Sequence, residues 1–391
     1  MNITLTSKIQ NDKYTEYVYD TFDIQNREET EVTIPMNLDG LNSFDWNIGV
    51  IYGGSGSGKS TILKELGTIK NIEFDVDKPL ISNFDWLEPE EASRVLTSIG
   101  LSSVPTWLRP FRLLSNGEQY RAYLAYLVAS AKDGDTILID EYTSVVDRDV
   151  AKAMSFALQK YIRRENKKII LASCHFDIME WLMPDWTLSP QKGGTLERGE
   201  WLRQGRPEIS LSVSRVEPQT FDFFKKHHYL TESVNNTYMF LLFEWNDKPI
   251  AINVIGRHLG KNGGFKVFRE SRIVVHPDYQ GMGIGSKISE FCGGVLKSIG
   301  GKFYTKTINP ALGIYRNEHT DTWKPTLFNG KVRHDNNEHS DVYKTIKVRA
   351  SYCHEYDGKS IEGYEDLLKP IGELRLQRRV DTETINKFFS F

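Results

Sequence analysis

The sequence has little cysteine and no long apolar run, and each of these absences excludes a class of protein. Its 391 residues include three cysteines, Cys174, Cys292 and Cys353, which are far apart. An odd and scattered set excludes a disulfide scaffold and a cysteine-based zinc site, and it is typical of a reducing compartment. No window reaches about 18 consecutive apolar residues, so we expect no transmembrane helix and no membrane partner. The first twenty residues lack the basic and then apolar pattern of a signal peptide, so we expect a cytoplasmic protein.

No strong net charge is present either, since the formal value is -3, but the two halves differ. Residues 1–205 carry 22 basic and 30 acidic side chains, whereas residues 206–391 carry 27 basic and 22 acidic ones. At roughly 100–200 residues per domain, the length predicts two domains. The charge difference indicates that they have different partners, with an anionic ligand for the basic half. Ordinary variation of surface charge is the alternative.

A glycine-rich segment between an expected strand and an expected helix predicts a phosphate site. The strand at 47–52 leads into Gly53, Gly54, Ser55, Gly56, Ser57, Gly58, Lys59, Ser60 and Thr61, and a helix is expected to continue over 62–66. This is G-x-x-x-x-G-K-S in the strand-to-helix setting that the motif requires. Backbone N–H groups and the helix N-terminus suit the β- and γ-phosphates of ATP. Lys59 would reach the same oxygens, and the Ser60 hydroxyl would ligate Mg²⁺.

Further motifs follow in a fixed order. A strand at 136–141 ends in Asp140 and Glu141, where one acid can hold Mg²⁺ and the next can polarise water. Before this strand, the run Leu-Ser-Asn-Gly-Glu-Gln at 114–119 precedes a helix expected at 120–131. After it come Ser-Val-Val-Asp at 144–147 and a strand that ends at His175.

The order of these motifs resembles that of the ABC ATPase superfamily over about residues 1–205. The resemblance implies a P-loop α/β domain in which Ser60 and Asp140 serve Mg²⁺, Glu141 is the general base and His175 contacts the γ-phosphate. It also implies that Ser115 and Gly117 of the signature bind ATP held by a second copy. An ATP-dependent, head-to-tail homodimer is therefore expected. Because the segment between Lys59 and the signature is short for the family, we expect a regulatory or nucleic-acid-associated member and not a transporter.

A second anion site is expected in the other half, after a linker at 206–212. A helix is expected over 218–228, a hairpin from strands at 238–244 and 249–255, and a further strand at 267–276. A glycine turn then precedes a helix at 286–298, and such a turn suits a pyrophosphate. No acidic residue follows at ribose-binding spacing and no βαβ repeat is present, which disfavours a dinucleotide fold.

The run from Ser271 to Gly285 resembles motif A of the GNAT acyltransferases, and the resemblance covers roughly residues 210–356. It implies an α+β transferase domain, here 213–391 with a C-terminal extension, that uses acetyl-CoA or another acyl-CoA. The amides of 281–286 would hold the pyrophosphate, and the strand edge at 274–275 would align the pantetheine arm. The implied contact residues are Val274, Val275, Gln280, Gly281, Met282, Gly283, Ile284, Gly285, Ser286 and Asn309. Tyr315, on the helix after Asn309, would protonate the CoA thiolate, with simple packing as the alternative.

The base that takes a proton from the acceptor is left open between two positions. Glu270 precedes motif A, and an exposed strand residue is the alternative reading. His227 and His228 lie where the first GNAT helix and its loop cover the acceptor, as a base or as substrate contacts, and a solvated basic helix end is the alternative there.

Three functions remain for the whole chain, which resembles ABC-type ATPases fused to a predicted acetyltransferase. The first is an ATP-dependent acyltransferase acting on a nucleic acid base that must be exposed before modification. The second is a nucleotide-regulated protein-lysine or small-amine acetyltransferase, and the third is a non-catalytic clamp with a GNAT fold as binding module. Several basic stretches of the second half support the nucleic acid acceptor, and ordinary solvent-exposed strand faces are the alternative interpretation. They are Lys324, Lys331, Arg333, Lys344, Lys347, Arg349, Arg375, Arg378 and Arg379.

Overall fold

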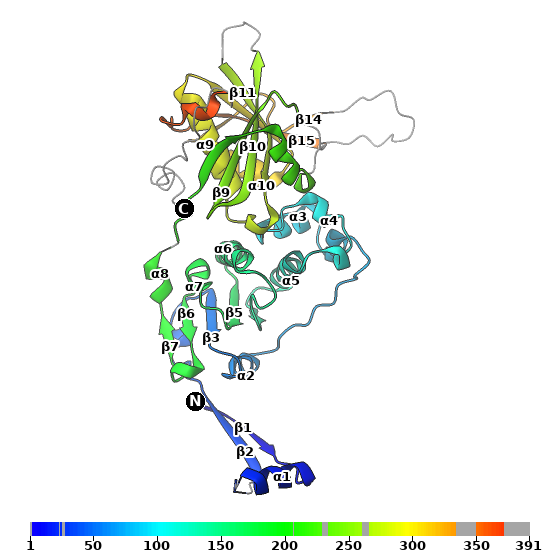
Figure 1. Ribbon diagram of the computed structural model, residues 1–391, viewed down its shortest axis with the longest axis vertical. Coiled ribbons are helices and arrows are strands. Elements are labelled where there is room, and N and C mark those ends of the chain that lie inside the picture. Colours follow the sequence, from blue (N-terminus) through cyan, green and yellow to red (C-terminus); the bar gives the residue numbers. More distant parts are fainter. Residues whose placement is uncertain are drawn as a thin grey trace. The chain divides into compact units, whose positions relative to one another are not determined.

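The computed structural model describes residues 2–22, 24–25, 28–205, 207–228, 234–259, 266–333 and 349–370 (Figure 1). Its contacts group the chain into two units. The first unit comprises Met1–Glu73, Leu127–Asp147 and Leu158–Arg206, and the second comprises Phe74–Tyr126, Arg148–Ala157 and Pro207–Phe391. The segment that carries the signature is thus grouped with the second half of the chain. The predicted linker at 206–212 stays a prediction.

The first unit is built on a five-stranded sheet in the order β4-β5-β3-β6-β7, in which only β7 runs antiparallel to its neighbour. Its strands and helices are β3 (Ile48–Tyr52), α2 (Lys59–Glu65), β4 (Thr136–Ile139), β5 (Lys168–Ser173), α7 (Met179–Leu182), β6 (Trp186–Leu188), β7 (Leu196–Arg198) and α8 (Glu200–Gln204). The predicted strands at 47–52, 136–141 and up to His175 are confirmed, each within one or two residues at its ends.

The core of the first unit explains the apolar strands. Every residue of β3 is buried, and Ile51 packs with Ile62, Leu138 and Ala172 in one cluster. Buried strands of a parallel sheet are apolar on both faces, so they read as continuous hydrophobic runs. A two-stranded arm of β1 (Asn2–Lys8) and β2 (Glu29–Pro35), with α1 (Lys13–Phe22) between them, also belongs to this unit.

The second unit combines helices from the first half of the chain with a large sheet. The helices are α3 (Pro89–Ser98), α4 (Val104–Trp107), and the first parts of α5 (Asn116–Ser130) and α6 (Arg148–Arg164). The later elements are β8 (Ser212–Val216), β9 (Met239–Trp245), β10 (Lys248–Leu259), β11 (Lys266–Val275), α9 (Ile284–Ser298), β12 (Lys302–Thr307), α10 (Pro310–Glu318), β13 (Trp323–Pro325), β14 (Lys331–Arg333) and β15 (Arg349–Tyr356).

The sheet order is β13-β15-β12-β11-β10-β9-β8, with β14 paired to β15, and only β11 and β12 are parallel neighbours. Their ladder joins Val267–Arg269 to Lys302–Tyr304 and goes no further among the described residues. The β12-facing edge of 270–275 therefore has no strand partner in the part of the chain that is described. This edge without a described strand partner, called below the opening between β11 and β12, lies beside the N-terminus of α9, since a Cβ on Gly285 would be 3.4 Å from the Val275 side chain.

Most predicted elements of the second half are confirmed, and one is wrong. The hairpin turns at Asn246 and Asp247, whose φ values of 50° and 61° suit a two-residue hairpin loop. Helix α9 begins two residues before the expected start and ends where expected, and α10 follows Asn309 and carries Tyr315 as expected. The helix expected over 218–228 is instead two 3-10 turns, Pro218–Phe223 and Lys225–His227. Phe221 and Phe224, three residues apart, both enter one buried cluster, and a 3-10 turn aligns residues at this spacing.

No helix among the described residues is long and apolar enough to cross a membrane.

Candidate functional site

The glycine-rich loop of the first unit connects β3 to α2 as the motif requires. Gly58 caps α2 with a φ of 92°, and a Cβ there would lie 2.7 Å from the Ile34 side chain, so only glycine fits. The Lys59 ammonium donates to the Gly54 carbonyl at 2.7 Å, and the Gly54 N–H donates to the Gln191 amide oxygen at 2.9 Å. Backbone N–H groups, an ammonium and a hydroxyl are the donors that a polyphosphate needs. Gln191 was not predicted, because it is distant in sequence and belongs to no motif.

The two acids and the histidine of the first unit follow the ends of buried strands. The Asp140 carboxylate accepts from the Glu141 N–H at 2.9 Å, and Glu141 is exposed with a φ of 50°. A non-glycine residue held in this left-handed region is uncommon and is often found at functional sites. The His175 ring lies 3.1 Å from the Thr143 hydroxyl, and the φ of Thr143 is 69°. The predicted roles of Asp140, Glu141 and His175 stay predictions.

The signature residues form the N-terminus of α5 in the second unit. The Ser115 N–H donates to the Glu118 carboxylate at 2.9 Å, and the Glu118 N–H donates to the Ser115 hydroxyl at 3.3 Å. This reciprocal pair is a capping box, and its S-x-x-E pattern was present in the sequence. Gly117 sits in the first turn, where N–H groups have no intrahelical acceptor.

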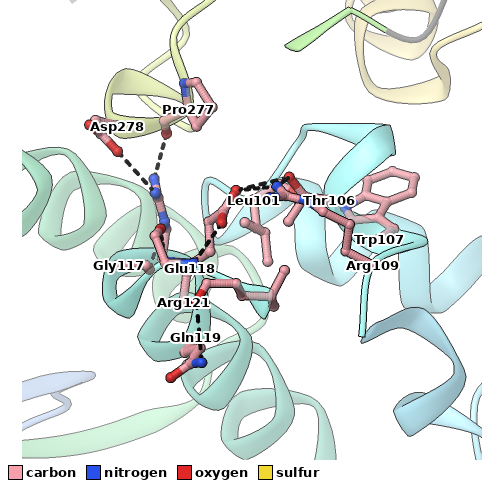
Figure 2. Close-up of polar contacts among 12 residues, drawn as sticks. Leu101, Thr106, Trp107, Arg109, Gly117, Glu118, Gln119, Arg121, Pro277 and Asp278 are labelled. Atoms are coloured by element: carbon pink, nitrogen blue, oxygen red, sulfur yellow. Dashed lines mark hydrogen bonds and ion pairs between the residues drawn. The ribbon is translucent and has the colours of Figure 1, made fainter. Parts of the chain in front are cut away.

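Glu118 anchors this helix end in the protein interior. Its carboxylate accepts from the Thr106 hydroxyl at 2.9 Å and from the Arg109 guanidinium at 2.8 Å (Figure 2). Burial would raise the pKa of Glu118, but the Ser115 N–H, Arg109 and Thr106 outweigh it and hold the pKa below its usual range. The carboxylate is therefore ionised and fixes the position of the signature.

The glycine turn before α9 has the geometry expected of a pyrophosphate site. Gly283 caps α9 with a φ of 83°, and Met282 and Ile284 are buried beneath the turn. The Gln280 side chain donates to the Val275 carbonyl at 2.9 Å and accepts from the Ser102 N–H at 2.8 Å. N–H groups at the start of a helix of this length suit a pyrophosphate. Gly281, Gly285 and Ser286 complete the predicted contact set, which stays a prediction.

Beside this turn, Val274 and Val275 end β11 and pair with Ile252 and Ala251 of β10. Their opposite edge faces the opening between β11 and β12. Asn309, a predicted cofactor contact, caps α10, because its side chain accepts from the N–H groups of Ala311 and Leu312 at 3.0 and 3.3 Å.

Tyr315 lies on α10 with a hydrogen bond that sequence reasoning missed. Its hydroxyl donates to the buried Glu290 carboxylate at 2.6 Å, and its ring stacks on His319 at 4.0 Å. Burial and the Glu290 carboxylate both raise the pKa of Tyr315 far above its usual range. The phenol therefore keeps its proton at any physiological pH.

Glu270 is buried, so the alternative that it is an exposed strand residue is wrong. Its carboxylate accepts from Arg316 at 2.8 Å and from the Asn253 amide at 3.1 Å. Arg316 also donates to the Ser289 hydroxyl at 2.8 Å, and its guanidinium lies 4.6 Å from the centre of the Trp323 ring. These contacts favour a structural ion pair, and the role of Glu270 as base stays a prediction.

His227 and His228 are half-buried and do not form a solvated helix end. The pKa of each is lowered to about 4, chiefly by burial, with the His276 ring and Lys226 adding to the effect at His227 and Arg272 at His228. Both rings are neutral at pH 7, and the His227 ring lies 5.0 Å from that of His276. The neighbouring Tyr229 and Leu230 lie outside the described residues.

A cavity of about 700 Å³ opens between β11, β12, β15 and the segment after β13. Basic and aromatic side chains line much of it, and among them are Arg269, Lys306, Lys324, Lys331, Tyr304 and Phe328. The Lys331 ammonium lies 5.7 Å from the centre of the Phe328 ring, and Lys324 is paired with Asp357. Of the remaining predicted basic residues, Lys344, Lys347, Arg375, Arg378 and Arg379 lie outside the described residues, and only the backbone is described at Arg333 and Arg349.

Comparison with known families addresses the middle of the chain, from α7 to the start of α10. Residues 177–313 match the model of the acetyltransferase (GNAT) family. The protein contains a GNAT domain. The glycine turn, α9 and the opening between β11 and β12 all lie within the GNAT match, whereas β13, β14 and β15 follow it.

Solved structures with distant similarity were found for both halves. A dimeric ATP-binding cassette bound to ADP and phosphate is 16% identical, with a TM-score of 0.32, and the match covers 45% of this chain and 94% of that one. A component of an ABC transporter complex from Clostridium perfringens is 17% identical, with a TM-score of 0.32 and coverage of 40% and 79%. The ribosomal-protein alanine N-acetyltransferase from Escherichia coli is 15% identical, with a TM-score of 0.28 and coverage of 39% and 97%. No curated protein matches the sequence.

The predicted fold class is confirmed. A P-loop α/β sheet, with its phosphate loop between β3 and α2, is followed by an α+β GNAT domain.

Proposed function

We propose that the protein is an acetyl-CoA-dependent acyltransferase coupled to binding and hydrolysis of Mg·ATP, and that its acceptor is a nucleic acid. The observation that carries the proposal is the glycine turn before α9 inside the GNAT match, next to a stretch of β11 that has no described strand partner on the β12 side. N–H groups at a helix start suit a pyrophosphate and an extended strand edge suits a pantetheine arm, which supports binding of acyl-CoA here. The glycine-rich loop between β3 and α2 of the first unit supports the binding of Mg·ATP.

In the ATPase half, we assign residues 1–205 to an ABC-type domain and 206–212 to a linker. Bound Mg·ATP supplies a phosphoanhydride whose hydrolysis drives the conformational cycle. Lys59 and the loop N–H groups bind the phosphates, while Ser60 and Asp140 hold Mg²⁺. Glu141 orients and deprotonates the attacking water, and His175 contacts the γ-phosphate.

The signature residues Ser115 and Gly117 bind the nucleotide of a second copy, so two chains form a head-to-tail homodimer. The capping box leaves the Ser115 O–H free to donate to a phosphate oxygen, because the hydroxyl only accepts from the Glu118 N–H.

In the transferase half, residues 213–391, bound acetyl-CoA supplies an activated acyl group. The N–H groups of 281–286 hold the pyrophosphate, and the edge at Val274 and Val275 aligns the pantetheine arm. The acceptor nitrogen forms a bond to the acyl carbon as the carbon–sulfur bond breaks, and the proton that the nitrogen loses passes to Glu270 or to the neutral ring of His227 or His228. We assign Tyr315 as the proton donor to the departing thiolate; burial and the Glu290 carboxylate keep its phenol protonated but also weaken it as an acid.

The cavity between β11, β12 and β15 supports a nucleic acid acceptor. Four of its lining side chains are lysine or arginine, and Tyr304 and Phe328 supply aromatic faces. Basic groups bind phosphates and aromatic rings stack on bases that have left a helix. Exposure of a paired base costs a few kcal/mol, and an ATP-driven remodelling step is one source of that free energy.

The test incubates the full chain with labelled acetyl-CoA, Mg·ATP and one acceptor at a time: tRNA, duplex DNA or a lysine peptide. We expect label on a nucleic acid, its loss in Lys59→Ala, and weaker binding of the nucleic acid as salt increases. Arg269→Ala and Phe328→Ala should weaken this binding. Lys369→Ala is the matched control, since Lys369 pairs with Asp366 outside the cavity.

Each other outcome identifies an alternative. Label on the peptide alone would identify a protein-lysine or small-amine acetyltransferase. If calorimetry finds no binding of acetyl-CoA, the GNAT domain is a binding module and the transferase proposal is wrong.

A further inference from the structure

Arg121 joins the signature helix to the turn that precedes α9. It lies in the second turn of α5, and its side chain is fully buried. Its Nε donates to the carbonyl of Gly117 at 3.2 Å, and its Nη1 donates to the carbonyl of Pro277 at 2.5 Å. Nη2 lies 3.5 Å from the Asp278 carboxylate (Figure 2). One guanidinium thus contacts both the signature and the segment that leads into the glycine turn.

The turn itself packs closely against the same helices. Ser102, between α3 and α4, donates its N–H to the Gln280 side chain at 2.8 Å. A Cβ on Gly281 would lie 2.6 Å from the Cβ of Ala157 in α6 and 2.8 Å from the Cα of Gly100. Arg121 Nη1 donates to the Gly100 carbonyl as well, at 3.3 Å. The position of the turn is therefore set on one side by the signature-bearing segment.

At its other end, Arg121 depends on the first turn of α5. Gly117 carries the carbonyl that Arg121 Nε contacts, and the capping box of Ser115 and Glu118 holds the same turn. A phosphate bound at the N–H groups of this turn fixes it further. Because the fully buried guanidinium donates to both carbonyls, a fixed Gly117 carbonyl also restrains the Nη1 contact to Pro277.

We propose that Arg121 is a positioning residue that couples nucleotide at the signature to binding of acyl-CoA at the turn before α9. The proposal rests on the proposed function, since it requires both ligands. When the second copy's ATP orders Gly117, Arg121 transmits this order to Pro277–Gly281. Acyl-CoA then binds a segment that is already ordered, so its binding loses less conformational entropy. Linkage requires that acyl-CoA tighten nucleotide binding at the signature by the same factor at each site.

The experiment measures the dissociation constant of acetyl-CoA by calorimetry on the full chain. Each protein is measured without nucleotide and with Mg²⁺ and saturating adenylyl imidodiphosphate, an ATP analogue that is not hydrolysed. For the natural sequence we expect the nucleotide to tighten acetyl-CoA binding by about tenfold, within the usual range of coupling between sites. In Arg121→Gln we expect the two dissociation constants to be equal.

Two further variants separate positioning from simple stabilisation. Tyr279→Phe removes a hydrogen bond of 3.3 Å from the same segment to Asp149, which is not part of the signature, so it should keep the tenfold response. If Arg121→Gln does not fold, Asp278→Asn replaces it, since the Asp278 side chain is 38% exposed and the change weakens the Arg121 contact. We expect it to reduce the response to nucleotide.

A tenfold response that survives in Arg121→Gln or Asp278→Asn overturns the coupling role and leaves the proposed function intact. If the natural sequence binds both acetyl-CoA and nucleotide but its dissociation constant for acetyl-CoA is the same with and without nucleotide, the coupling role is also overturned and the proposed function stays intact. If the natural sequence binds no acetyl-CoA or no nucleotide, the proposed function itself is overturned and the coupling with it.

Discussion

The close packing of Gly281 gives a prediction whose magnitude follows from the structure. In Gly281→Ala, the new Cβ meets Ala157 Cβ at 2.6 Å and Gly100 Cα at 2.8 Å, and one of these atoms is backbone. Overpacking of this kind costs about 1–3 kcal/mol. The φ of 87° adds about 1–2 kcal/mol for any residue with a Cβ. We therefore expect the free energy of unfolding to fall by about 2–5 kcal/mol.

Gly300→Ala is the matched control for this variant. Gly300 has a φ of 71° in the same unit, and a Cβ there meets no atom within 4 Å. It should therefore lose only the conformational part, about 1–2 kcal/mol. Urea unfolding followed by circular dichroism gives both values, and calorimetry should show weaker acetyl-CoA binding in Gly281→Ala alone.

Adding Ala157→Gly to Gly281→Ala sharpens the result. The 2.6 Å contact disappears and the 2.8 Å contact to Gly100 remains, so we expect partial recovery and a non-additive pair. If Gly281→Ala is no less stable than Gly300→Ala, the turn does not pack against Gly100 and Ala157, and the reasoning about this segment is wrong.

Three more predictions concern buried polar groups of the second unit. Glu270→Gln leaves Arg316 buried without its charge partner and should lower the free energy of unfolding by about 3 kcal/mol in urea titrations. A loss of transferase activity with unchanged stability would instead identify Glu270 as the base. Tyr315→Phe should lower kcat for acyl transfer by about 10²-fold at unchanged KM, because the proton for the thiolate is lost. An unchanged kcat would assign Tyr315 a packing role. His227, His228 and His354 have pKa values of about 4, lowered chiefly by burial from 6.5, so the unfolded chain binds protons between these values and the folded chain does not. The stability is therefore full above pH 6.5 and falls as the pH decreases towards 4, and urea midpoints that stay constant across this range would contradict the burial of these rings.

Much of the local structure was predictable because its causes are local. Asn309 caps α10 through hydrogen bonds to residues two and three positions later, and the Asn246–Asp247 turn needs only its own two positive φ values. The capping box of Ser115 and Glu118 was also visible as S-x-x-E, although the resemblance to a signature drew attention to Ser115 and Gly117 only.

Prediction was wrong where packing decides the backbone. The spacing of Phe221 and Phe224 is compatible with an α-helix, and a proline precedes them. In the structure both rings are buried in a cluster with Phe240 and Val274, and 3-10 turns bring them there. Glu270 was read as either an exposed residue or a base, and its partner Arg316 lies 46 residues away. Nothing in the local sequence links the two.

The sequence by itself determined where a glycine turn meets a helix N-terminus, a geometry that suits anions, because glycine at a left-handed position and a following helix start are properties of a few consecutive residues. Gly58 and Gly283 could be identified in this way. Only the tertiary structure decided what lies against those turns. Arg121 contacts Pro277, which is 156 residues further along the chain, and a buried charge finds its partner through non-local packing that no local pattern encodes.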